Sequence, residues 1–151
     1  MTNPQLSRLF EDYAAYHRHP ANKMTHYIGV PLIIFTVVGL LSRISLGPMS
    51  LAAPVALAVV AYDLRLSVKL TLPFAAFIGV CFLVAPAVPI TFLWTGFVGG
   101  WILQFVGHFV YEKKSPAFFK NLEQLLVGPL WLLEEAASRG ARPEKGRKSL
   151  P

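Results

Sequence analysis

Charged residues are scarce in this sequence, and their scarcity excludes most classes of soluble protein. Asp, Glu, Lys and Arg make up 15% of the 151 residues, whereas roughly a quarter is usual in a soluble domain. Hydrophobic residues make up 54%, and the mean hydropathy is +0.51. So little polar surface cannot coat a soluble core, and a disordered chain would be far more polar. The composition therefore predicts one membrane-embedded domain, covering residues 1–138.

Several motifs of soluble enzymes are also absent. The sequence has no glycine-rich phosphate loop, CxxC pair, HExxH motif or serine nucleophile elbow. Its one cysteine, Cys81, lies within an apolar run and cannot form an internal disulfide. The net charge of +6 comes from basic residues that flank apolar runs. That pattern is typical of a membrane surface rather than of nucleic-acid binding, so membrane lipids and no nucleic acid are the expected partners.

Long apolar runs define the expected fold class. Between Leu70 and Tyr111 lie 42 consecutive residues without a charged side chain. A transmembrane helix needs about 20 residues, so this run predicts two spans, separated where Pro86 and Pro89 interrupt the helical hydrogen bonds. Two further apolar runs precede it. We therefore expect an all-α, polytopic membrane protein with four transmembrane helices, at about residues 24–41, 48–62, 70–86 and 90–111.

The basic residues predict the orientation of these spans. Most of them precede the first span, lie between the second and third, or follow the fourth, whereas the opposite side holds only Arg43. Because cytosolic loops carry the excess of Lys and Arg, both termini are expected in the cytosol, which requires an even number of spans. The sequence has no recognisable retention signal, which favours a bacterial inner membrane over the endoplasmic reticulum.

Two amphipathic helices are expected in the membrane interface, at 4–18 and 116–137. In the first, apolar residues recur at helical spacing, and His17 lies on that apolar stripe. In the second, apolar and charged positions alternate, and Gly128-Pro129 predicts a kink. Trp131 is expected among the aromatic anchors of the membrane surface. The basic residues 139–151 are expected to form a flexible tail.

All four histidines fall at the same face of the membrane in this topology. His17, His19 and His26 precede or open the first span, and His108 closes the fourth. Antiparallel spans return the chain to one depth, so residues about ninety positions apart are expected to converge. His108 shares a helix face with Glu112, four residues on, and with Gln104, one turn earlier. Asn22 is expected to cap the first span, with His26 in its first turn.

This convergence predicts a metal site. Two or three histidines with a carboxylate and open coordination positions are typical of non-haem iron(II) oxygenases. Each histidine taken alone also fits an interfacial side chain, and Glu112 also fits an ion pair with Lys113, Lys114 or Arg18. His19, beside Pro20 in a turn, is left outside the expected ligand set.

Two stretches resemble the signature blocks of the membrane 2-hydroxy fatty acid dioxygenases. Residues 16–31 read YHRHPANKMTHYIGVP, and residues 101–117 read WILQFVGHFVYEKKSPA. The family pattern has Tyr-His, Pro-x-Asn and a His followed by x-x-x-Val-Pro, and later Gln-Phe-x-Gly-His-x-x-x-Glu. The resemblance implies an iron(II) (Fe2+) enzyme that decarboxylates a 2-hydroxy long-chain fatty acid with dioxygen, giving a fatty acid one carbon shorter.

Carried over by position, the resemblance implies metal-binding or catalytic roles for His17, His26 and His108. Glu112 would be a further ligand or an acid behind the ligands, and Asn22 and Gln104 would support the site. Two alternatives remain open at this stage. A membrane zinc hydrolase acting on lipid would use the same ligands, and a non-catalytic membrane scaffold or lipid-binding protein would use the histidines only to cap helices.

Overall fold

The structure is a computed structural model that describes residues 3–140, and it is all-α apart from one short hairpin. The expected all-α class is confirmed. Its elements are α1 (Pro4–Ala15), α2 (Pro20–Leu41), β1 (Ser45–Leu46), β2 (Met49–Ser50), α3 (Ala52–Leu66), α4 (Val68–Val84), the 3-10 helix η1 (Ala85–Ala87), α5 (Ile90–Phe105), the π-helix η2 (Val106–Glu112), the 3-10 helix η3 (Ala117–Phe119) and α6 (Glu123–Gly140).

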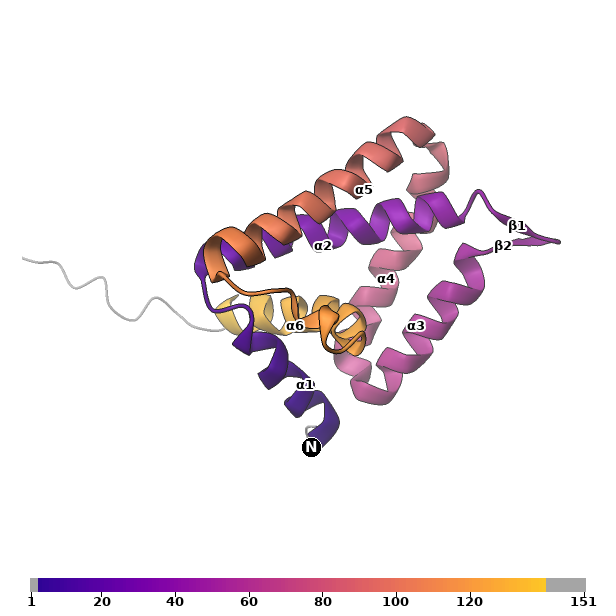
Figure 1. The fold of residues 1–151 in the computed structure, drawn as a ribbon. Helices are drawn as coiled ribbons and strands as arrows, with labels where there is room; N and C mark the ends of the chain where they lie inside the picture. Colours follow the sequence, from indigo (N-terminus) through magenta and orange to yellow (C-terminus); the bar gives the residue numbers. More distant parts are fainter. Residues whose placement is uncertain (1–2, 141–151) are drawn as a thin grey trace, which may run out of the picture.

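The long helices α2 and α5 lie side by side along most of their length (Figure 1). The hairpin lies at one end of this pair. The start of α2, the end of α5, α1 and α6 gather at the other. Helices α2 and α3 diverge from the hairpin, and α4 runs back between them. The arrangement brings the first and last parts of the chain to one end of the bundle.

Three helical stretches are long and apolar enough to cross a membrane, at Pro20–Leu41, Val68–Ala87 and Ile90–Glu112. The expected second span also forms a helix, but α3 has 15 residues. At 1.5 Å per residue it reaches only about 22 Å, less than the roughly 30 Å of a bilayer core. It has as many residues as the expected span at 48–62 but begins four residues later, because the antiparallel pairing of Ser45 with Ser50, and of Leu46 with Met49, takes the first residues of that run.

The first two helices differ from expectation at their boundary. Asn3 caps α1 by accepting a hydrogen bond from the Gln5 N–H at 2.9 Å. Helix α1 ends at Ala15 rather than at 18, and α2 begins at Pro20 rather than at 24. The expectation that Asn22 caps the first span is wrong. His19 is the cap, and its Nδ1 accepts from the Ala21 N–H at 3.1 Å.

Helix α6 packs against the bundle through one apolar face. Val127 and Leu130 are fully buried in a cluster with Leu6 of α1 and with Leu70 and Phe74 of α4. The helix begins at Glu123, later than the expected 116, because η3 and a turn occupy the preceding residues. Its backbone remains helical to Gly140, past the expected start of the tail at 139. The rest of the expected tail, 141–151, lies outside the described residues.

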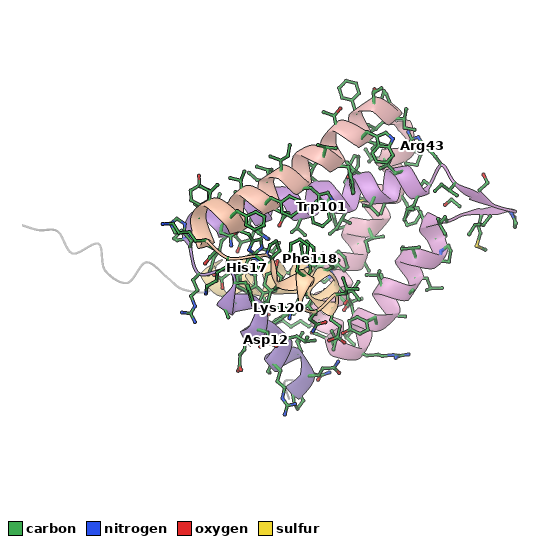
Figure 2. The ribbon with its side chains drawn as sticks, viewed as in Figure 1. Asp12, His17, Arg43, Trp101, Phe118 and Lys120 are labelled. Atoms are coloured by element: carbon green, nitrogen blue, oxygen red, sulfur yellow. The ribbon has the colours of Figure 1, made fainter. Side chains whose placement is uncertain are left out.

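Arg43 holds the far end of the bundle together, opposite the end that carries His17 (Figure 2). Its guanidinium donates to the Gly39 carbonyl at 2.5 Å, to the Pro86 carbonyl at 3.5 Å and to the Val88 carbonyl. The last carbonyls of a helix lack intrahelical partners. The Arg43 side chain therefore provides a hydrogen-bond donor for a carbonyl near the end of α2 and links that end to η1 and the residue that follows it.

Candidate metal centre

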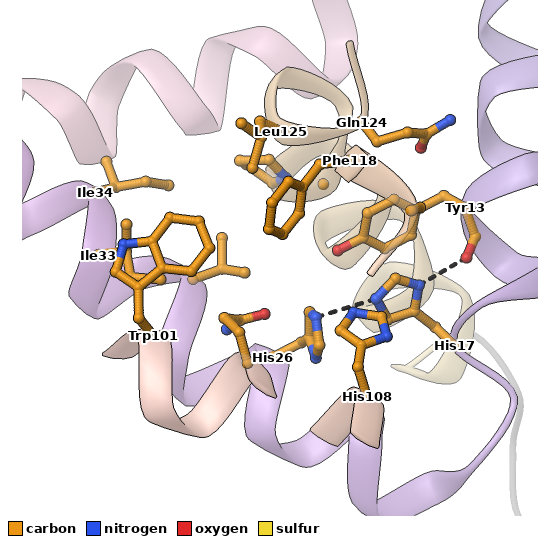
Figure 3. A pocket seen from close by; sticks show the side chains of 15 residues that line it. Tyr13, His17, His26, Ile33, Ile34, Trp101, His108, Phe118, Gln124 and Leu125 are labelled. Carbon is orange, nitrogen blue, oxygen red and sulfur yellow. Dashed lines mark hydrogen bonds between the residues drawn. The ribbon is translucent and has the colours of Figure 1, made fainter. Parts of the chain in front are cut away.

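Three histidines from separate segments meet in the interior of the structure. His17 follows α1, His26 lies in the second turn of α2, and His108 lies in η2. Each imidazole offers one nitrogen, and these three nitrogens lie within 4.8 Å of one another. None of the three residues is more than 3% exposed. Figure 3 shows the rings facing one another at one end of a cavity.

The main chain orients two of these rings. The Nδ1 of His17 lies 2.6 Å from the carbonyl oxygen of Tyr13, and the Nδ1 of His26 lies 2.9 Å from that of Asn22. A carbonyl oxygen only accepts hydrogen bonds, so each Nδ1 carries the proton and donates it. The Nε2 of each neutral ring is then left with a lone pair, and the two Nε2 atoms lie 3.0 Å apart.

This arrangement fits a metal ion. Two lone pairs that face each other at 3.0 Å repel, and a cation between them converts that repulsion into attraction. Two nitrogens at this separation can both contact one ion. Hydrogen bonds from the far ring nitrogen to carbonyl oxygens are the usual support of ligating histidines.

Burial keeps His17 in the form that binds metals. Loss of hydration lowers the pKa of His17 from 6.5 to about 2, and charge on His26 acts in the same direction. The neutral imidazole is the form that coordinates a metal. His17 is therefore available as a ligand throughout the neutral pH range.

His108 reaches this group because the helix widens around it. Residues Val106–Glu112 form a π-helix, an arrangement that is rare and frequently marks functional sites. Gly107 brings this turn against α2, since a β-carbon there would overlap Asn22 Oδ1 and Thr25 Oγ1. The Nδ1 of His108 is buried without a hydrogen-bond partner, and a buried polar atom in that condition calls for a ligand or an ion.

Glu112 lies outside the histidine group. Its Oε1 accepts hydrogen bonds from the His19 N–H at 2.5 Å and from the Asn22 side-chain amide at 3.3 Å. The same amide donates to the Tyr16 carbonyl at 3.1 Å. Asn22 is completely buried, and its own main-chain carbonyl orients His26. Glu112 thus joins the end of η2 to the first turn of α2.

His19 points elsewhere, as expected of a residue outside the ligand set. It is exposed, caps α2 and stacks on Tyr111 with ring centroids 5.3 Å apart. The exposed His19 therefore lies in surroundings clearly different from those of the three buried histidines.

Aromatic packing behind His17 was not anticipated from the sequence. Tyr13 stacks on His17, and Trp131 of α6 lies against both, with centroids 5.0 Å from Tyr13 and 5.7 Å from His17. Trp131 is 6% exposed, so the expectation that it anchors the membrane surface is wrong. Gly128 makes room for this packing, because a β-carbon there would lie 3.0 Å from the Tyr13 hydroxyl. In the sequence, the Gly128-Pro129 pair was the feature that could have indicated this close packing of α6 against Tyr13.

A cavity of about 90 Å³ opens beside the three histidines (Figure 3). Gln104 lines it, is 5% exposed and has a buried Nε2 without a hydrogen-bond partner. Gly29 leaves the space that this amide occupies. Apolar side chains form the wall away from the histidines, among them Ile33, Trp101 and Phe118. The site thus combines a candidate metal position with the unpartnered amide of Gln104 and an apolar wall.

Comparison with known proteins gives two matches of the same kind. A family model described as 2-hydroxy-palmitic acid dioxygenase Mpo1-like matches residues 4–139. The 2-hydroxy-palmitic acid dioxygenase MPO1 of Saccharomyces cerevisiae is 37% identical over 134 residues, covering 82% of this chain and 74% of the yeast protein. No solved structure matches the chain.

Proposed function

This chain belongs to the Mpo1-like 2-hydroxy-palmitic acid dioxygenase family, and we propose that His17, His26 and His108 hold the iron(II) ion of its reaction. By family and relative it is a 2-hydroxy fatty acid dioxygenase of alpha-oxidation. The observation that carries the proposed ligand set is the pair of facing Nε2 atoms of His17 and His26, with the buried His108 beside them.

Iron(II) is favoured because the reaction requires a redox-active metal, and two or three histidines with open positions are typical of non-haem iron(II) oxygenases. Imidazole binds iron, zinc and copper alike, so the three histidines alone leave the metal open. A dioxygenase needs a metal that reacts with dioxygen, which zinc, without redox chemistry, does not. When bound, iron(II) would supply the means to activate dioxygen, and three protein ligands would leave positions for both substrates.

The protein groups around the ion would position it and keep water away. The Tyr13 and Asn22 carbonyls fix the ring orientations of His17 and His26. Glu112 acts through Asn22, as a positioning residue behind the ligands. Gln104, whose Nε2 has no partner, would donate a hydrogen bond to the carboxylate or 2-hydroxyl of the substrate.

The overall reaction balances with two substrates alone. A 2-hydroxy fatty acid and dioxygen give a fatty acid one carbon shorter, carbon dioxide and water. The bond between the carboxyl carbon and the 2-carbon breaks, and the 2-carbon is oxidised to the new carboxyl group. Four electrons pass from the substrate to dioxygen, so no further reductant is needed.

A membrane setting suits this substrate. Three helices are long and apolar enough to span a bilayer, and α3 would complete a fourth, shorter traverse that returns the chain to the side of the histidines. Both termini would then face the cytosol, with the polar site at that surface and the acyl chain among the helices. The excess of basic residues on this side supports the cytosolic orientation, and the lack of a recognisable retention signal favours a bacterial inner membrane over the endoplasmic reticulum.

Anaerobic purification followed by metal analysis and oxygen uptake tests the proposal. We expect about one iron per chain and oxygen consumption with 2-hydroxypalmitic acid, but none with palmitic acid. Removal of iron should abolish uptake, and iron(II) should restore it where zinc does not. Full activity of a zinc-loaded, iron-free protein would overturn the assignment of iron.

A further inference from the structure

The geometry points to a specific place for the acyl tail of the substrate, an inference that rests on the proposed function. A second cavity, here called the tail cavity, has a volume of about 300 Å³ and is lined almost wholly by apolar atoms of α2, α3, α4, α5 and α6. We propose that the tail lies in this cavity and that residues of α3 limit the length of chain accepted.

The tail cavity adjoins the cavity beside the histidines. The two share five lining residues: Ile33, Ile34, Trp101, Leu125 and Pro129. Figure 3 shows Ile33, Ile34, Trp101 and Leu125 at the end of the histidine cavity that faces away from the rings. A chain whose polar head lies at the histidines would therefore enter the tail cavity directly past these side chains.

The dimensions suit a long acyl chain. Along α2, the path runs from His26 to Leu41, which lines the far end of the tail cavity. Fifteen helical residues rise about 22 Å. This path is longer than one leaflet of acyl chains, which is about half of a roughly 30 Å core, so it can hold a long acyl chain. Val38 and Ala52, both buried, line the same far end, while Ala56 lines the cavity along α3.

One other apolar cavity competes for the tail. It has a volume of about 260 Å³, adjoins the histidine cavity through Val30, Ile34 and Pro129, and extends to Ala136 of α6. It shares three lining residues with the histidine cavity rather than five, and its lining on α2 ends at Ile34, whereas that of the tail cavity continues to Leu41. The tail cavity is therefore the better fit, and the second cavity supplies a matched control.

The test places the same bulky side chain in each cavity. Ala56→Phe fills part of the tail cavity, and Ala136→Phe fills part of the competing one. Oxygen uptake is measured with 2-hydroxyoctanoic, 2-hydroxymyristic, 2-hydroxypalmitic and 2-hydroxystearic acids, on iron-loaded protein in detergent. We expect Ala56→Phe to lower kcat/KM for the longest acids by about tenfold or more, since contacts of the last methylenes are lost.

The shortest acid does not reach Ala56, so its kcat/KM should change by less than about twofold in Ala56→Phe. In Ala136→Phe, the dependence of kcat/KM on chain length should be the same as in the unsubstituted protein. If Ala56→Phe fails to fold, Ala56→Leu should shift the profile in the same direction. An unchanged profile in a folded, iron-loaded Ala56 variant would overturn the inference, as would a shift caused by Ala136→Phe instead. If the unsubstituted protein oxidises none of the acids, the proposed function fails rather than this inference.

Discussion

The phenol ring of Tyr13 lies flat on the imidazole of His17, with ring centroids 3.9 Å apart and planes inclined by 7°. The same residue accepts the hydrogen bond from His17 Nδ1 through its main-chain carbonyl. Tyr13 therefore restrains His17 twice, in the plane of the ring and perpendicular to it. A ligand held in this way loses little rotational freedom when it binds a metal.

Replacement of Tyr13 separates the two restraints. Tyr13→Leu removes the stacked ring but keeps the carbonyl, and we expect iron affinity to fall about tenfold, as is typical for residues behind metal ligands. Tyr13→Phe keeps the ring and should retain the affinity. Competition with a chromophoric chelator measures both. Equal affinity of the Leu and Phe variants would show that stacking contributes nothing to the site.

Alanine at each buried histidine should abolish iron binding. His17→Ala, His26→Ala and His108→Ala each remove one of three nitrogens, and the purified proteins should contain little iron and consume no oxygen. His19→Asn is the matched control, because Asn also caps helices and His19 lies outside the group. Stoichiometric iron in any of the three alanine variants would remove that residue from the ligand set.

Substitution of Glu112 distinguishes a metal ligand from a positioning residue. Glu112→Gln keeps a carbonyl oxygen that can accept from the His19 N–H and the Asn22 amide, so iron content should be unchanged. Glu112→Ala removes the acceptor and should lower the free energy of unfolding by about 1 kcal/mol. Metal analysis and thermal unfolding in detergent measure these effects. Loss of iron from a stable Gln variant would make the carboxylate a ligand.

Alanine at Gly107 should destabilise the contact between η2 and α2. The added β-carbon would overlap Asn22 Oδ1 and Thr25 Oγ1, and overpacking of this kind costs about 1–3 kcal/mol. Gly99→Ala is the control, because nothing lies within 4 Å of a β-carbon at that position. Thermal unfolding should separate the two variants. Equal stability would mean that the π-helix tolerates a wider spacing from α2.

Gln104 is expected to act on the substrate rather than on the metal. Gln104→Leu removes the unpartnered amide while keeping most of the side-chain volume, so iron content should be unchanged. With the hydrogen bond to the substrate lost, kcat/KM should fall about tenfold. Steady-state oxygen uptake with 2-hydroxypalmitic acid measures this. Unchanged kinetics in the iron-loaded variant would restrict Gln104 to packing.

The sequence predicted much of this arrangement because span counting needs little detail. The ends of an apolar run and the charged residues beside it predict the depth of each helix end in the membrane. This was sufficient to predict that His17 and His26 lie at the same end of the bundle as His108. The hairpin at Ser45–Ser50 was missed because six residues of mixed polarity carry no clear period. Its presence moves the start of the second helix from the expected 48 to Ala52.

Finer features of the site depend on contacts between segments that are distant in sequence. Helical spacing placed Glu112 on the same face as His108, but the π-helix and the nearby start of α2 direct its carboxylate to Asn22 and His19. Trp131 was taken for a surface anchor because an aromatic residue near a membrane end usually is one. Only the packing of α6 against α1 shows it behind His17.

The widened turn at Val106–Glu112 makes the spacing of this stretch as important as its residue types. Loss of a single residue here would return the segment to a regular helix and rotate everything that follows by about 100°. His108 would keep its neighbours on one side, yet the chain leading to α6 would leave in another direction. Relatives that keep this centre should therefore align through 106–112 without gaps, even where the side chains differ.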